Sequence, residues 1–100
     1  MARTAEKFHT FDAAYYLDSP EELAEFISDA LETGNVAYIA HALGVVARAK
    51  GMAQMAKETG LSREQLYRSF SETGNPTLKT LLAVTRSLGI DMAAKPRPPH

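Results

Sequence analysis

The chain has 100 residues, of which 45% are hydrophobic and 23% are charged, so it can form one small domain with a modest core. It contains no cysteine, which excludes a disulfide framework, a zinc site with cysteine ligands and a thiol nucleophile. No stretch approaches the roughly 18 apolar residues that a membrane-spanning helix needs. The first ten residues also lack the apolar core of a secretory signal, so we expect a cytoplasmic protein.

The net charge of −1 conceals an uneven distribution along the chain. Residues 1–47 contain eight acidic and two basic side chains, whereas residues 48–86 contain three acidic and seven basic ones. This division favours two partners of opposite charge, one for each half. The alternative is a chance distribution over a solvated surface.

The sequence predicts three parts. Residues 1–17 form an N-terminal arm, because the aromatic residues of FHTFDAAYYL follow neither a helical nor a strand period. These aromatics either pack on the body of the protein or mark an interaction surface. Residues 18–94 form the folded domain, and the proline-rich segment 95–100 (KPRPPH) is expected to be a disordered tail.

Two helices are predicted at the start of the domain. Ser19 is expected to cap the first, with Pro20 at its first position and Glu22 completing a capping box. Apolar residues then recur at helical spacing until Gly34 ends the helix. Asn35 is the expected cap of the second helix, which covers residues 36–50 and stops at Gly51.

The last predicted helix begins at Asn75-Pro76, by the same logic of a cap followed by proline, and ends at Gly89. Five residues at helical spacing are its expected buried stripe: Leu78, Leu81, Leu82, Thr85 and Leu88. Residues 90–94 are compatible with a short strand. The whole pattern predicts an all-α fold of about five helices.

Between these elements, residues 52–58 and 63–70 are predicted to form a helix-turn-helix. Ala56 is small where the two helices cross, and Gly60 tolerates the left-handed backbone of a sharp turn. Ser62 and Gln65 have the spacing of a capping box for the second helix. Three apolar residues form the wedge between the helices: Met55, Leu61 and Leu66.

The second of these helices presents a face that suits DNA. Leu66 and Phe70 point inward, although Ser69 occupies a position where an apolar core residue is usual. The expected outward residues are Arg63, Glu64, Tyr67 and Arg68. Arginine can contact guanine and glutamate can accept from cytosine in the major groove. We expect phosphate contacts from Lys57 and Lys79; simple packing of helices is the alternative.

Most of the chain resembles a known family. The segment GMAQMAKETGLSREQLYRSFSETGNPTLKTLLAVTRSLGI is similar to addiction-module antidote proteins, the HigA-like antitoxins of the lambda-repressor-like helix-turn-helix superfamily. The likeness extends upstream to FDAAYYLDSPEEL, and so covers roughly residues 8–90. It implies an antitoxin that neutralises a RelE/HigB-like, mRNA-cleaving toxin. It also implies a homodimer that binds double-stranded operator DNA and represses its own operon.

Two alternatives remain open. The chain could be a phage-type transcriptional repressor without a toxin partner, or a protein-interaction module whose helix-turn-helix no longer binds DNA. The resemblance implies that Arg63, Glu64, Tyr67 and Arg68 read bases and that Ser62 contacts a phosphate. The candidates for toxin contact share an aromatic or acidic character in the N-terminal half: Phe8, Phe11, Tyr15, Tyr16, Glu21, Glu22 and Glu25. The alternative for these residues is a role as core aromatics and as a solvated helix start.

No enzyme is predicted. The three histidines, His9, His41 and His100, lack the spacing of metal ligands, and no base stands at a recognisable spacing from Ser62. No glycine-rich phosphate loop is present either. We therefore expect no catalytic residue, metal or cofactor.

Overall fold

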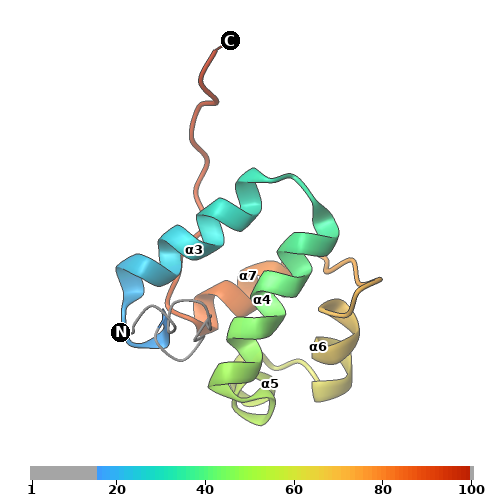
Figure 1. Cartoon of the computed structure of the whole chain (residues 1–100). Helices are drawn as coiled ribbons and strands as arrows, with labels where there is room; N and C mark the ends of the chain where they lie inside the picture. Colours follow the sequence, from blue (N-terminus) through green and yellow to red (C-terminus); the bar gives the residue numbers. More distant parts are fainter. Residues whose placement is uncertain (1–15, 100) are drawn as a thin grey trace, which may run out of the picture.

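The computed structural model describes residues 16–99, which form an all-helical fold. Its five helices are α3 Pro20–Glu32, α4 Val36–Lys50, α5 Met52–Thr59, α6 Arg63–Ser69 and α7 Leu78–Ser87. Helix α3 packs on α4, and α5 contacts α4, α6 and α7 (Figure 1). The fold class predicted from the sequence is therefore confirmed. The C-terminal end of the chain extends away from the helical body beyond α3 (Figure 1).

The core lies where all five helices meet. Each helix contributes buried apolar side chains, and these are Leu23, Ile27, Ala40, Leu43, Val46, Ala47, Met52, Met55, Leu66 and Val84. Phe70 and Ile90, which follow α6 and α7, complete the cluster. Because several of these residues are alanine or valine, α4 can approach its neighbours closely. The core thus fixes α5 and α6 against the rest of the domain.

The predicted boundary between α3 and α4 is confirmed. Gly34 adopts a left-handed φ of 66° directly after α3. Asn35 then caps α4, since its side chain accepts a hydrogen bond from the Tyr38 backbone N–H at 3.0 Å. At the other end of α4, the Gly51 N–H donates to the Ala47 carbonyl at 2.9 Å. Local residue chemistry therefore sets both ends of α4.

The predicted cap of α3 is partly wrong. Ser19 occupies the N-cap position and Pro20 follows it at the start of the helix, as predicted. The Ser19 side chain makes no capping hydrogen bond, however, so the expected capping box does not form. The backbone of Ser19, with φ −135° and ψ 88°, departs from the extended geometry that both Asn35 and Ser62 adopt at their caps.

The predicted start of α7 is also wrong. The helix begins at Leu78 rather than after Asn75, because the Thr77 hydroxyl accepts the Thr80 N–H at 3.1 Å and acts as the cap. Leu78 consequently stands at the exposed edge of the helix and keeps 64% of its surface exposed. Thr85 is buried as predicted, and Val84, which the predicted stripe left out, is buried beside it.

No strand occurs within residues 16–99, so the short strand considered for residues 90–94 is absent. Gly89 has a left-handed φ of 81° and turns the chain at the end of α7. The Ile90 N–H then donates to the Thr85 carbonyl at 2.8 Å, and the Ile90 side chain is buried in the core. This segment therefore closes α7 instead of pairing with another strand.

Candidate nucleic-acid interface

The turn between α5 and α6 has the predicted geometry. Gly60 adopts φ 78° and ψ 6°, and its N–H donates to the Ala56 carbonyl at 3.0 Å. Thr59 reinforces the turn, since its hydroxyl donates to the Met55 carbonyl at 2.7 Å and accepts from the Leu61 N–H at 3.2 Å. A side chain other than glycine is disfavoured in this left-handed conformation. The turn thus sets the direction in which α6 leaves α5.

The N-terminus of α6 is closed by the predicted capping box. The Ser62 hydroxyl accepts from the Gln65 N–H at 3.0 Å, and the Gln65 side chain accepts from the Ser62 N–H at 2.9 Å. A helix of seven residues has little intrinsic stability, so this reciprocal cap and its packing hold it in place.

The inner face of α6 is anchored in the core. Leu66 is fully buried and Phe70, at the C-terminal end of the helix, is 2% exposed. Phe70 lies against Gly44 of α4, where an added Cβ would come within 3.1 Å of the Phe70 Cβ. Ser69 is half-buried, so Phe70 supplies the apolar contact that Ser69 cannot provide.

The outer face of α6 carries the residues predicted to read bases. Arg63, Glu64, Tyr67 and Arg68 are all exposed, and Tyr67 keeps 44% of its surface accessible. Tyr67 follows Arg63 by four residues, as Arg68 follows Glu64, so the four positions form one continuous strip. The strip combines two guanidinium groups, a carboxylate and an aromatic ring on a supported helix. The predicted phosphate contacts Ser62, Lys57 and Lys79 are exposed as well.

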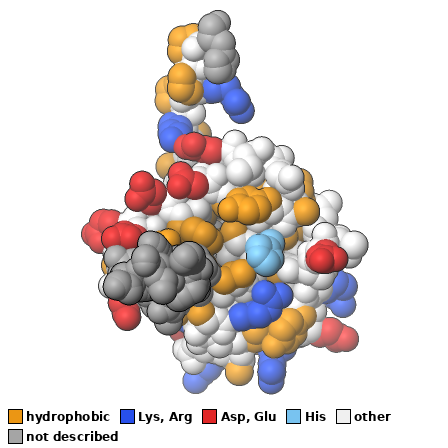
Figure 2. Space-filling view, in the orientation of Figure 1, with side chains coloured by type: hydrophobic (Ala, Val, Ile, Leu, Met, Phe, Trp, Pro, Cys, Tyr) orange, Lys and Arg blue, Asp and Glu red, His pale blue; other side chains and the backbone are white. Residues whose placement is uncertain are grey.

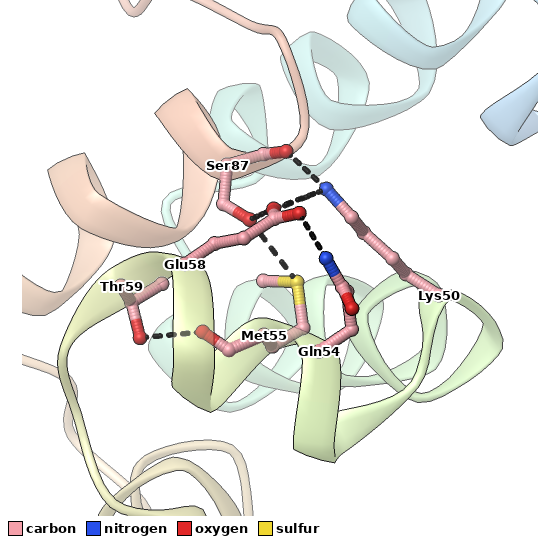
Figure 3. A network of polar contacts seen from close by, with 6 residues as sticks. All are labelled: Lys50, Gln54, Met55, Glu58, Thr59 and Ser87. Carbon is pink, nitrogen blue, oxygen red and sulfur yellow. Dashed lines mark hydrogen bonds and ion pairs between the residues drawn. The ribbon is translucent and has the colours of Figure 1, made fainter.

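A polar network that the sequence did not predict joins three helices (Figure 3). The Lys50 ammonium lies 2.7 Å from a Glu58 carboxylate oxygen and also donates to the Ser87 carbonyl. The Ser87 hydroxyl and the Gln54 amide donate to the same carboxylate, at 2.6 and 2.5 Å. These hydrogen bonds, above all the one from Lys50, lower the pKa of Glu58 to about 2. The network ties the end of α4 and the end of α7 to α5, on which the turn to α6 depends.

Comparison with known proteins identifies the family. The family described as "Probable addiction module antidote protein" matches residues 7–96. The chain belongs to this addiction module antidote family. A protein of Haemophilus influenzae (strain ATCC 51907 / DSM 11121 / KW20 / Rd), described as "Uncharacterized protein", is 41% identical over 85 residues. The alignment covers 85% of this chain and 88% of that protein. No solved structure matches the chain.

An antidote protein implies a toxin partner, and the sequence placed the candidate toxin contacts in the N-terminal half. Phe8, Phe11 and Tyr15 lie outside the described residues. Tyr16 is half-buried and stacks on Phe26 of α3, with the two ring centroids 5.0 Å apart. The three acidic candidates, Glu21, Glu22 and Glu25, are exposed on α3. Acidic side chains gather along this helix on the surface (Figure 2).

Other kinds of site find no support in the described part of this antidote protein. Within residues 16–99, no three His, Asp or Glu side chains are grouped closely enough to hold a metal ion. His41 is exposed on α4, as the sequence predicted. No described helix is long and apolar enough to span a bilayer.

Proposed function

We propose that this chain is the antitoxin of a type II toxin–antitoxin module, related to the HigA-like antitoxins of the lambda-repressor-like superfamily. In this proposal it neutralises a RelE/HigB-like toxin that cleaves mRNA. It also represses its own operon in the cytoplasm by binding operator DNA. The family supports the antidote role in general. The toxin class and the DNA-binding role are the further steps proposed here.

One observation carries the DNA-binding role: α6 is buried through Leu66 on one side and presents Arg63, Glu64, Tyr67 and Arg68 on the other. A helix placed this way can enter the major groove, where base pairs differ in their donors and acceptors. The forked guanidinium of arginine suits guanine, and the Glu64 carboxylate suits the amino group of cytosine. Lys57, Lys79 and the Ser62 hydroxyl would contact phosphates along the edges of the groove.

The proposal includes a homodimer on the operator. One recognition helix reads only a few base pairs, whereas two related by a twofold axis read half-sites about one DNA turn apart. Doubling the contact also raises the affinity above what a 100-residue monomer can reach alone. A protein that stays monomeric both in solution and on its operator would contradict this part of the proposal.

Substitution of the two arginines tests the DNA-binding role. Arg63→Ala and Arg68→Ala should each weaken binding to the operon's promoter by about 1–3 kcal/mol, and each should relax the choice of base at its own position. Arg97→Ala, in the exposed C-terminal segment, is the matched control and should bind like wild type. Gel-shift titrations at a fixed moderate salt concentration measure all three. Unchanged binding by both α6 variants would show that α6 is not the recognition helix.

A test of toxin neutralisation distinguishes the antitoxin role from the role of a phage-type repressor. The reading frame beside this gene should encode a small basic protein that stops bacterial growth when it is expressed alone. Co-expression of this chain should restore growth and yield a stable complex. A chain that binds its promoter but has no such neighbour, or does not restore growth, would be a repressor without a toxin partner.

A further inference from the structure

An apolar groove lies on the outer surface of α3 and α4, away from the exposed strip on α6. A hollow of about 240 Å³ is lined by Phe26, Tyr38, His41, Ala42 and Val45. Apolar side chains are gathered around the histidine on this face (Figure 2). Tyr38 is 48% exposed and Val36, nearby at the start of α4, is 53% exposed. Both are large, mainly apolar side chains that remain exposed to solvent.

The groove continues toward the end of α6. A second hollow of about 610 Å³ shares Tyr38 and His41 with the first and extends to Phe70. Arg48 and Glu72 stand at this far end, so its charges are mixed. At the other end, beside α3, His41 is the one titratable residue apart from Tyr38 among the described lining residues, and the remaining lining is apolar.

The acidic face of α3 meets the groove at Phe26. At about 100° per residue, the five acidic positions of α3 fall on a single face of the helix. They are Glu21, Glu22, Glu25, Asp29 and Glu32, all exposed, of which Glu32 is already paired with Lys95. Phe26 lies at the edge of this face, with Glu22 one turn before it and Asp29 three residues after it. The aromatic wall of the groove is therefore also the border of an acidic surface.

We infer that this groove, together with the acidic face of α3, is the docking surface for the toxin. This inference rests on the antitoxin role proposed above. The chemistry fits a basic protein that inserts an apolar side chain between Phe26 and Tyr38 while its cations face α3. An apolar anchor surrounded by complementary charge is the arrangement that gives both affinity and fast association.

A second copy of this chain fits the surface less well. A twofold interface centred on the groove would place the acidic face of α3 either against its symmetry mate, where like charges repel, or against the end near Arg48 and Glu72, whose opposite charges offer no net attraction. Toxin docking also leaves α6 free, because none of its exposed strip, from Arg63 to Arg68, lines either hollow. The antitoxin could thus hold its toxin and its operator at the same time.

Calorimetric titration with the purified product of the adjacent reading frame tests the inference. Tyr38→Ala removes the exposed aromatic ring but keeps the hydrogen bond from the backbone N–H of residue 38 to the Asn35 side chain. It should weaken toxin binding at least tenfold. The double variant Glu25→Lys and Asp29→Lys should also weaken it about tenfold, with most of the loss disappearing at high salt. Leu78→Ala and Asp91→Lys are the apolar and charge controls, because both residues are exposed and line neither hollow. Circular dichroism confirms that each variant is folded.

The outcomes distinguish this inference from the proposed function. If wild type binds the toxin and the groove variants bind it equally well, the docking surface is wrong while the antitoxin role stands. If Tyr38→Ala converts a dimer into a monomer without loss of toxin affinity, the groove belongs to a second copy and the inference is overturned. If wild type does not bind the toxin at all, the antitoxin role itself fails and the docking surface falls with it.

Discussion

Lys50 at the end of α4 and Glu58 near the end of α5 form an ion pair with an N–O distance of 2.7 Å. Their side chains are 22% and 34% exposed, so the pair lies at the surface but is partly shielded. Ser87 adds a third helix, because its carbonyl accepts from Lys50 and its hydroxyl donates to Glu58. The arrangement fixes the helix that precedes the Gly60 turn, and therefore bears on the placement of α6.

Stability should depend on pH through Glu58. The hydrogen bonds from Lys50, Ser87 and Gln54 lower its folded-state pKa from 4.5 to about 2. A lowered carboxylate pKa stabilises the folded state above the unfolded pKa, and this contribution is lost as pH falls from about 4.5 toward 2. Glu58→Gln should therefore be less stable than wild type at pH 7, and the difference should shrink within that window.

Urea denaturation from pH 7 down to pH 2 measures this difference. Glu72→Gln, an exposed carboxylate of the loop before α7 that stands outside the network, is the control. Its offset from wild type should vary much less across the window. A stability difference for Glu58→Gln that stays constant between pH 7 and 2 would mean that the network contributes nothing through the charge of Glu58.

Glycine is required at position 74 because a larger residue has no room there, and not because of its backbone angles. A Cβ at this position would lie 2.2 Å from the Ser69 carbonyl oxygen and 2.7 Å from that of Arg68. Because both obstacles are backbone atoms of α6, the loop or the end of α6 would have to move. Gly74→Ala should lower the free energy of unfolding by about 1–3 kcal/mol, as overpacking does elsewhere.

Gly34→Ala is the matched comparison for Gly74. Its Cβ would meet open space, so only the left-handed φ of 66° opposes the substitution. That cost is about 1–2 kcal/mol. Gly74→Ala should also impair operator binding, because it displaces the end of α6, whereas Gly34→Ala should not. Urea denaturation measures the stability of both variants, and a Gly74→Ala variant as stable as wild type would refute the steric explanation. Equal effects on operator binding would show that the end of α6 is not displaced.

The two serine caps should respond differently to substitution. Ser62→Ala removes the hydroxyl that accepts from the Gln65 N–H, although the backbone N–H of residue 62 can still donate to the Gln65 side chain, and should cost about 1 kcal/mol. Ser19→Ala should be nearly neutral, because the Ser19 side chain makes no capping hydrogen bond. Thermal unfolding of the two variants under identical conditions makes the comparison. A larger loss for Ser19→Ala than for Ser62→Ala would contradict this assignment of the two caps.

Local signals predicted the helices well, but they failed at Ser19, whose side chain makes no capping hydrogen bond, and at the start of α7, where two candidate caps compete. Gly34, Asn35 and Ser62 each act on residues within a few positions, so their roles could be inferred from spacing alone. At α7, both Asn75 and Thr77 have side chains that can cap a helix. Their spacing in the sequence does not decide which of the two accepts the free backbone N–H. The choice of Thr77 moved the start of the helix and left Leu78 exposed.

Features built from distant residues could not be predicted in this way. Ser87 contacts Lys50 across 37 positions and Glu58 across 29, and nothing in a helical period specifies those pairs. The exposed strip on α6 was predictable because one helix creates it. The groove between Phe26 and Tyr38 was missed because it exists only once α3 has packed on α4.

Lys57 and Lys79 should contribute to operator binding without reading sequence. Both are exposed cations outside α6, on α5 and in the first turn of α7. A lysine that neutralises one phosphate releases counterions, so its loss should reduce the salt slope of binding by about 1 and weaken all DNA sequences alike. Lys95→Ala is the control, because Lys95 lies in the C-terminal segment and is already paired with Glu32 of α3. Operator and non-operator duplexes titrated at several salt concentrations give the slopes. If the Lys57→Ala and Lys79→Ala slopes equal that of wild type, the DNA path lies elsewhere on the protein; a loss confined to the operator would mean that these lysines read bases.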